Sequence, residues 1–435
     1  MAEHAMTEHA PGTSSFETRC LHADGHEKPM NSHVWPIFQT STFMFDSPDH
    51  GADLFAGRAE GHIYSRIGNP TVQAFERLMA NLDEGVGSVG FSSGMAAVTG
   101  CLMPFLRAGD SVVLGDTMYG PSISLAQKYL TRWGITVLIV DSGNLSEIDR
   151  VLHTSPPPKL LYLESPANPT NKITDIAAVS AKAHEVGALV AVDATFATPF
   201  FQRPLALGAD LSLHSLTKVS CSSQHSPPPH LAHPHSPTTS LQYIAGHGDV
   251  IGGVVTCAKE EHVNTVRTWR KDTGGILSPL DAFLVMRGIR TLPVRMEQLN
   301  KNAIAVARFL RSHPAVEQVL HPVFDDFPNH QVAVRQMSGF GSTFSFTMKA
   351  GYDAAKALLE NVHLAVVAVS LGGVDTLIEH PASMTHCGVP LDLMRQQGLT
   401  PSLIRISVGL ENPDEIIADL AQAIEAATAA FPVKI

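Results

Sequence analysis

Three charged residues stand where short apolar runs of the sequence end: Glu164 after KLLYL, Asp193 after ALVAV, and Lys218 at the close of GADLSLHSLTK. Short apolar runs that alternate with helical stretches are typical of parallel strands, whose carboxyl ends share one edge of a sheet. We therefore expect these three side chains to lie near one another. Lys218 follows an apolar run containing Ser215 and Thr217. An amine held away from water can be neutral, as a Schiff-base nucleophile must be.

Two other patterns indicate anion binding. Ser93, Gly94 and Met95, of which the first two are small, precede a helical stretch, where backbone N–H groups and the positive helix end could hold a phosphate, although SSG alone is only a turn. Arg405 lies inside the apolar run LIRISVGLE (403–411) and needs an anionic partner. That partner is either a substrate carboxylate, which suits the bidentate guanidinium, or an internal Asp or Glu.

Alternating strands and helices are expected to position these residues. The strands predicted first are 111–116, 135–141, 159–165 and 188–194, with helical stretches between them that include 122–134. Such alternation implies right-handed βαβ crossovers and a mainly parallel sheet, which makes the fold α/β.

A second region is expected to begin near residue 290. It has a long helix over 298–312, strands over 342–348, 364–371 and 403–411, and a final helix capped by Asn412 or Asp414. The predicted organisation is therefore an irregular N-terminal arm (1–60), a large domain (61–290) and a smaller C-terminal α+β domain (291–435).

The composition is that of an ordinary soluble enzyme. The chain has 435 residues, of which 44% are hydrophobic and 16% charged, and its net charge is −11 without a basic block. We therefore expect neither nucleic acid nor membrane as a partner. Five dispersed cysteines without CxxC spacing, no apolar run of about 20 residues and no targeting pattern at the N-terminus predict a cytoplasmic protein with reduced thiols.

The segment 219–242, VSCSSQHSPPPHLAHPHSPTTSLQ, interrupts the sequence directly after Lys218. Without it the chain reads HSLTKYIAGHGDVIGG without a seam. Its composition suits a disordered loop. Its histidines (225, 230, 233 and 235) have Pro-rich spacing that sets no ligand geometry, so we predict no metal site. We favour a translated intron, because Val219-Ser220 and Gln242 are compatible with splice-site codons.

Eight motifs occur in an order and at a spacing that are specific together: YSRIGNPT (64–71), SSGMAAV (92–98), ESPANPT (164–170), VDATFATPF (192–200), HSLTK (214–218), KDTGG (271–275), VSLGGVDTLIEHPASMTH (369–386) and IRISVGLE (404–411). On these motifs the chain resembles the Cys/Met-metabolism family of fold-type-I pyridoxal-phosphate (PLP) enzymes over about residues 15–430, apart from 219–242. Within that family it is most like the methionine γ-lyases. The resemblance implies an aspartate-aminotransferase-like fold with a mainly parallel sheet in the large domain, and PLP as the cofactor.

The resemblance also implies which residues hold the cofactor. Lys218 would carry it as a Schiff base, and Asp193 would pair with the ring nitrogen, although a strand-end Asp is also a common turn cap. The phosphate would be held by Ser93, Gly94, Met95, Ser215 and Thr217, and by Tyr64 and Arg66 from a neighbouring subunit. The active site would then need at least a dimer, and such enzymes are usually tetramers.

Five further residues match positions that meet the ring or the substrate. Tyr119 would stack on the ring and protonate the leaving group, and Asn168 would contact the ring oxygen. Arg405 and Ser370 would bind the substrate α-carboxylate. Val369 stands where cystathionine-using relatives have an acidic residue, and an apolar side chain there favours a thioether over an ammonium group.

These matches predict a PLP-dependent carbon–sulfur lyase that acts by γ-elimination on L-methionine or a related sulfur amino acid, giving 2-oxobutanoate, ammonia and a thiol. Lys271-Asp272 fits the methionine-lyase pattern, whereas Pro121 stands where many methionine γ-lyases have Cys. Alternatives within the class are a cystathionine γ-lyase and a γ-replacement enzyme, either O-acetylhomoserine sulfhydrylase or cystathionine γ-synthase. The alternative from another class is an inactive, mis-spliced or regulatory form, which the segment 219–242 suggests.

Overall fold

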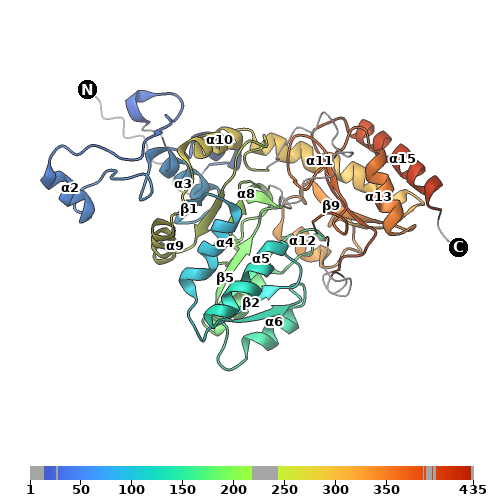
Figure 1. Ribbon diagram of the computed structural model, residues 1–435, viewed down its shortest axis with the longest axis horizontal. Coiled ribbons are helices and arrows are strands. Elements are labelled where there is room, and N and C mark those ends of the chain that lie inside the picture. The colour runs from blue at the N-terminus through green and yellow to red at the C-terminus, as the bar shows by residue number, and fades with distance from the viewer. Residues whose placement is uncertain are drawn as a thin grey trace.

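A seven-stranded sheet forms the centre of the larger part of the molecule (Figure 1). The computed structural model describes residues 14–25, 28–217, 243–385, 387, 394 and 398–432. The sheet has the strand order β1-β7-β6-β5-β4-β2-β3. Its strands are β1 (Gly87–Phe91), β2 (Ser111–Gly115), β3 (Thr136–Val140), β4 (Leu160–Glu164), β5 (Leu189–Asp193), β6 (Leu211–Ser215) and β7 (Gly253–Cys257). Strands β3, β2, β4, β5 and β6 run parallel and β7 is antiparallel to both its neighbours, as expected for a mainly parallel sheet.

Both faces of this sheet are covered, which is why its central strand β4 is buried along its whole length and is mostly apolar. On one face, Tyr162 and Ala191 pack with Ala97 of α4; on the other, Leu161 and Val190 pack in a separate cluster. The helices of this part are α3 (Pro70–Leu82), α4 (Gly94–Leu102), α5 (Gly120–Leu125), α6 (Leu145–Leu152), α7 (Ile176–Glu185), α8 (Thr198–Phe201), α9 (Glu260–Thr273) and α10 (Pro279–Ile289). The helix expected over 122–134 is α5 continued by a π-helical turn and a 3-10 turn.

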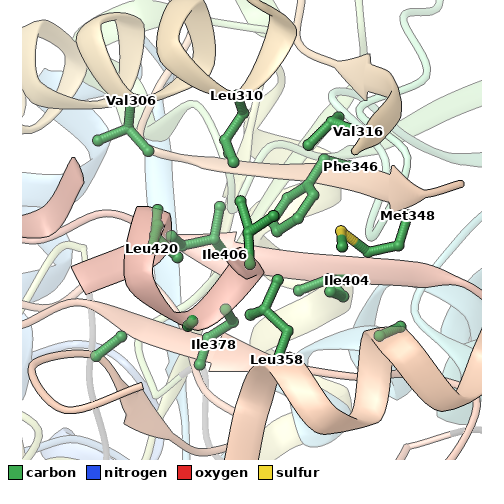
Figure 2. Close-up of a cluster of buried hydrophobic side chains, with 14 of the residues drawn as sticks. Val306, Leu310, Val316, Phe346, Met348, Leu358, Ile378, Ile404, Ile406 and Leu420 are labelled. Atoms are coloured by element: carbon green, nitrogen blue, oxygen red, sulfur yellow. The ribbon is translucent and has the colours of Figure 1, made fainter. Parts of the chain in front are cut away.

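The second part is built on a five-stranded sheet of order β10-β11-β12-β9-β8. Its strands are β8 (Val316–Leu320), β9 (Thr343–Met348), β10 (Val366–Val367), β11 (Leu377–Glu379) and β12 (Leu403–Ser407). Its helices are α11 (Leu292–Ser312), α12 (His330–Gln336), α13 (Tyr352–Asn361) and α15 (Pro413–Ala430). Side chains from both layers form one core, in which Leu310, Phe346, Ile406 and Leu420 lie together (Figure 2). Of the two candidate caps of the last helix, Asn412 accepts the N–H of Asp414.

Two expectations about secondary structure are wrong. The strand predicted over 364–371 is reduced to β10, because Asp419 takes the N–H groups of 363–365 and Arg405 takes the carbonyls of 369 and 370. The N-terminal arm is not wholly irregular, because it contains α1 (Phe16–His22) and α2 (Pro48–Phe55). Ser15 and Ser47 cap these helices, and the segment that carries α2 extends away from the body (Figure 1). The division of the chain into three regions stays a prediction.

The loop that follows β4, residues 165–174, joins the two sheets. Asn171 Nδ2 donates to the carbonyl oxygens of Leu320 and Thr343, at 3.3 and 2.9 Å. Ser345 Oγ donates to the carbonyl of Pro169 at 2.7 Å. Polar side chains therefore hold this loop against the second sheet, and Ile173 adds to them by joining an apolar cluster against which Leu320 of β8 packs.

Candidate active site

The carboxyl edge of the large sheet gathers the polar residues that the sequence placed at strand ends. Glu164 and Asp193 are register partners on β4 and β5, so their side chains lie on the same face of the sheet. Asp193 is also paired with Leu213 of β6, and Ser215, two residues further on, shares that face. Tyr162 and Ala191 lie two residues before Glu164 and Asp193 on the same strands, so their side chains are on the same face of the sheet. Because Tyr162 and Ala191 pack with α4, the polar side chains at the strand ends face that helix. Lys218 lies outside the described residues.

Asp193 is a buried carboxylate with its two oxygens in different settings. Oδ1 accepts hydrogen bonds from the N–H and the hydroxyl of Thr195, at 3.0 and 2.5 Å, and so caps the turn. Oδ2 accepts the hydroxyl of Tyr162 at 3.3 Å. Burial, and then the charge of Asp193, raise the pKa of Tyr162 well above its usual value, so this phenol stays a donor. Oδ1 of Asp193 therefore caps the turn, while Oδ2 accepts a longer hydrogen bond from Tyr162.

The beginning of α4 meets the ends of β6 and β7 at very short range. A Cβ added at Gly94 would lie 2.7 Å from Ser215 Oγ, and one at Gly253 would lie 2.5 Å from the carbonyl oxygen of Ser93. Ser93 Oγ accepts the N–H of Ala96 and caps the helix. The first N–H groups of a helix have no intrahelical acceptor, so those of Gly94 and Met95 form a donor set suited to a phosphate.

Thr217 is the last residue that the structure describes before residues 218–242. Its hydroxyl donates to the carbonyl of Gly252 at 3.1 Å and accepts the N–H of the same residue. The end of β6 is thereby tied to the residue that precedes β7. Where the description resumes at Tyr243, Arg295 donates to the carbonyls of Tyr243 and Ile244 at 2.7 and 3.3 Å.

Tyr119 and Asn168 are held by a single carboxylate. Glu164 Oε2 accepts the N–H of Tyr119 at 2.7 Å, and Oε1 accepts the N–H of Asn168 at 2.7 Å. Glu164 is 3% exposed. It therefore joins the turn after β2 to the turn after β4.

Arg405 reaches this group from β12 of the second sheet. Its Nη1 donates to Asn168 Oδ1 at 3.1 Å and lies 3.0 Å from Glu379 Oε1. Its Nη2 donates to the carbonyls of Val369 and Ser370, at 3.0 and 2.9 Å. The internal carboxylate weighed as an alternative is thus present, since Glu379 lies directly opposite Arg405 on β11.

Tyr64 and Arg66 lie in a different place from the residues above. They belong to the segment between α2 and α3, where Tyr64 is 42% exposed. Arg66 lies over the Tyr64 ring, 5.7 Å from its centroid, and its Nη1 donates to the carbonyl of Lys271 at 2.7 Å. Their contacts are therefore with each other and with α9, on an accessible surface.

Three residues of the site escaped the sequence reasoning. Thr195 and Tyr162 hold Asp193, and Glu379 pairs with Arg405. The available signal was a polar residue next to a strand end, as in VDAT, or inside an apolar strand, as in TLIEH. No such pattern states which residues meet across the sheet.

Two absences were found within the residues that the structure describes. No helix among them is both long enough and apolar enough to cross a membrane. Over the same ranges, His, Cys, Asp and Glu side chains form no group of three or more that could hold a metal ion. The four histidines of the segment 219–242 fall outside those ranges.

Comparison with known proteins gives a consistent result. The family model described as "Cys/Met metabolism PLP-dependent enzyme" matches residues 17–220 and 235–425, so its gap falls inside 219–242. The chain is 43% identical to an L-methionine γ-lyase of Fusobacterium nucleatum subsp. polymorphum, covering 94% of this chain and 97% of that protein. It is 40% identical to a cystathionine γ-lyase of Bacillus subtilis (90% and 93% covered). Among solved structures, cystathionine γ-synthase from Xanthomonas oryzae pv. oryzae with cystathionine matches with a TM-score of 0.85 and 34% identity, over 96% of this chain and 99% of that one.

Proposed function

This chain belongs to the Cys/Met metabolism family of PLP-dependent enzymes, and we propose that it catalyses γ-elimination from L-methionine or a related sulfur amino acid. It is a PLP-dependent carbon–sulfur lyase, with relatives named methionine γ-lyase, cystathionine γ-lyase and cystathionine β-lyase. The observation that carries the choice of methionine is 43% identity to an L-methionine γ-lyase over 94% of this chain. With methionine and water, the products would be methanethiol, ammonia and 2-oxobutanoate.

The residues at the sheet edge fit the cofactor. A glycine-dependent approach of α4 to β6 and β7 leaves helix N–H groups for a phosphate, beside the hydroxyl of Ser215. Thr217, two residues further along the chain, would supply a second hydroxyl. Asp193 is buried, and among the described residues its Oδ2 accepts just the 3.3 Å hydrogen bond from Tyr162, so it suits a protonated ring nitrogen. Lys218 would form the covalent link. When bound, PLP withdraws electrons from the substrate carbon that carries the amino group.

The chain's own residues would then move protons and hold the substrate. Arg405 would bind the α-carboxylate beside Ser370, even though Glu379 neutralises part of its charge. The amine of Lys218 would remove the α-proton. The hydroxyl of Tyr119 would donate a proton to the departing sulfur, so that the thiol leaves as a neutral molecule.

Cystathionine γ-lyase or γ-replacement activity is the second candidate. It is favoured by the 40% identity to the Bacillus subtilis cystathionine γ-lyase and by the match to cystathionine γ-synthase. Val369 argues against it, because an apolar side chain near the distal group of the substrate disfavours an ammonium group. The carbonyl of this residue accepts a hydrogen bond from Arg405, which places Val369 beside the residue proposed to bind the substrate carboxylate.

We also propose a cytoplasmic homotetramer whose dimers share active sites. The support is the placement of Tyr64 and Arg66 on the exposed segment between α2 and α3, from which they could reach the phosphate site of a neighbouring subunit. Cross-linking and light scattering of the PLP-loaded protein test the oligomeric state.

The deciding experiment compares 2-oxobutanoate release from methionine, cystathionine and O-acetylhomoserine, with no added thiol acceptor. We expect methionine to give the highest kcat/KM, with one methanethiol released per 2-oxobutanoate. A preference for cystathionine, or product formation only when a thiol is added, would replace the proposal by the second candidate. A protein that shows no visible absorbance of lysine-bound PLP would instead be the inactive form.

A further inference from the structure

We propose that Glu164 is a positioning residue. It fixes Tyr119, the proposed acid for the leaving group, and at the same time Asn168, which contacts the proposed carboxylate-binding residue Arg405. The proposal rests on the function proposed above, since it assigns Tyr119 and Arg405 the roles given there. Glu164 itself is not expected to touch substrate, because both of its oxygens accept backbone N–H groups.

The geometry makes one carboxylate the link between two separate turns. Tyr119 belongs to the turn after β2, whereas Asn168 belongs to the loop after β4. Both N–H groups lie 2.7 Å from an oxygen of Glu164, which is short for N–H···O hydrogen bonds and typical of charge-assisted ones. Glu164 is 3% exposed, so water has little access to its oxygens and replaces neither bond at low cost.

The link continues from Asn168 to the second sheet. Asn168 Oδ1 accepts Nη1 of Arg405 at 3.1 Å, while its own N–H is fixed by Glu164. One contact of the guanidinium, in addition to those with Glu379 and with the carbonyls of Val369 and Ser370, therefore depends on the same side chain that fixes Tyr119. A displaced Glu164 would shift both Tyr119 and Arg405 relative to Asp193, which is paired with Glu164 across β4 and β5.

Substitution by Gln separates this role from simple packing. The amide keeps the shape of Glu164 but has one acceptor oxygen, so one of the two N–H groups would face an NH₂ group and lose its partner. Asp keeps the charge and is one methylene shorter, so it cannot span both turns. Asp210 provides a matched control, because this buried carboxylate accepts the N–H of Val190 at 2.9 Å at the opposite edge of the sheet.

The test compares Glu164→Gln, Glu164→Asp and Asp210→Asn with the wild type, all loaded with PLP. We expect Glu164→Gln to lower kcat/KM for methionine by about tenfold or more relative to the wild type. The kcat/KM of Glu164→Asp should lie between those of the wild type and Glu164→Gln. The loss should be smaller for O-acetylhomoserine, because acetate leaves without the protonation that a thiolate needs. Asp210→Asn should leave the ratio between the two substrates unchanged.

Hydrogen exchange supplies a readout that does not depend on turnover. Peptides covering 117–122 and 165–170 should exchange faster in Glu164→Gln and unchanged in Asp210→Asn. An equal loss for both substrates, or unchanged exchange in these peptides, would overturn the positioning role. If the wild type releases 2-oxobutanoate from none of the substrates, the proposed function fails, while the exchange result still decides whether Glu164 holds the two turns.

Discussion

His321 should make the stability of this protein fall in mild acid. The side chain is completely buried among Phe324, Phe340 and Phe344, with the closest ring centroid 5.1 Å away. Its Nδ1 accepts the N–H of Val323 at 3.0 Å, so the neutral ring carries its proton on Nε2. Burial lowers the pKa of His321 to about 3.

The sign and size of the effect follow from this pKa. An unfolded His titrates near 6.5, so below that pH the unfolded chain binds a proton that the folded protein excludes. The contribution of neutral His321 is thus fully present above about pH 6.5 and is lost as the pH falls toward 3. We expect a loss of about 2 kcal/mol at pH 5 relative to neutral pH.

The assay is urea unfolding of the PLP-loaded protein at pH 7.5 and pH 5, followed by tryptophan fluorescence. His321→Asn keeps an acceptor for the N–H of Val323 but cannot titrate, so it should be less stable at pH 7.5 and lose about 2 kcal/mol less than the wild type on acidification. His153→Asn, at a surface histidine with a 59% exposed side chain, is the control. The same pH-dependent loss in His321→Asn and in the wild type would refute the reasoning.

Three further substitutions and one deletion test the site. Gly94→Ala places a Cβ 2.7 Å from Ser215 Oγ, so we expect loss of bound PLP, measured by visible absorbance and fluorescence titration. Asp193→Asn should retain PLP but lower kcat by about a hundredfold or more, because a neutral amide cannot hold a cationic ring nitrogen; a kcat near that of the wild type would contradict this. Arg405→Lys should raise KM for methionine at least about tenfold, measured by initial rates. Deletion of 219–242 should increase kcat and bound PLP, and equal activity of both forms would show that the segment is tolerated.

The continuous apolar runs explain why part of the fold was predictable. Strands β2, β4 and β5 are covered on both faces, so their sequences are mostly apolar up to the strand ends, and these ends were predicted within two residues. Strand β1 was missed because Gly87, Ser88 and Gly90 carry little strand signal, yet their small size admits Val263 and Leu277. The strand expected over 364–371 failed because its N–H and carbonyl groups are taken by side chains distant in sequence.

Candidate site residues could be predicted where their placement depends on the neighbouring sequence. They could not be predicted where it depends on which strands or turns come together in the fold. Asp193 lies at a strand end as expected, and the small residues at 93–95 begin a helix. The pairing of Arg405 with Glu379 depends on the register of β11 against β12, which a single sequence does not state. The two bonds accepted by Glu164 connect residues 45 and 4 positions away, and only the folded sheet brings the first of them into range.

The loop over 165–174 has a consequence for dissecting this enzyme into parts. It follows directly from β4, yet Asn171 and Pro169 satisfy polar groups of the second sheet. A fragment ending near residue 290 would keep this loop but remove those partners, and the other fragment would be left with exposed carbonyls on β8 and β9. The two halves are therefore not exchangeable modules. Transplanting the C-terminal half from a relative with another substrate should succeed only when its contacts to this loop are carried along.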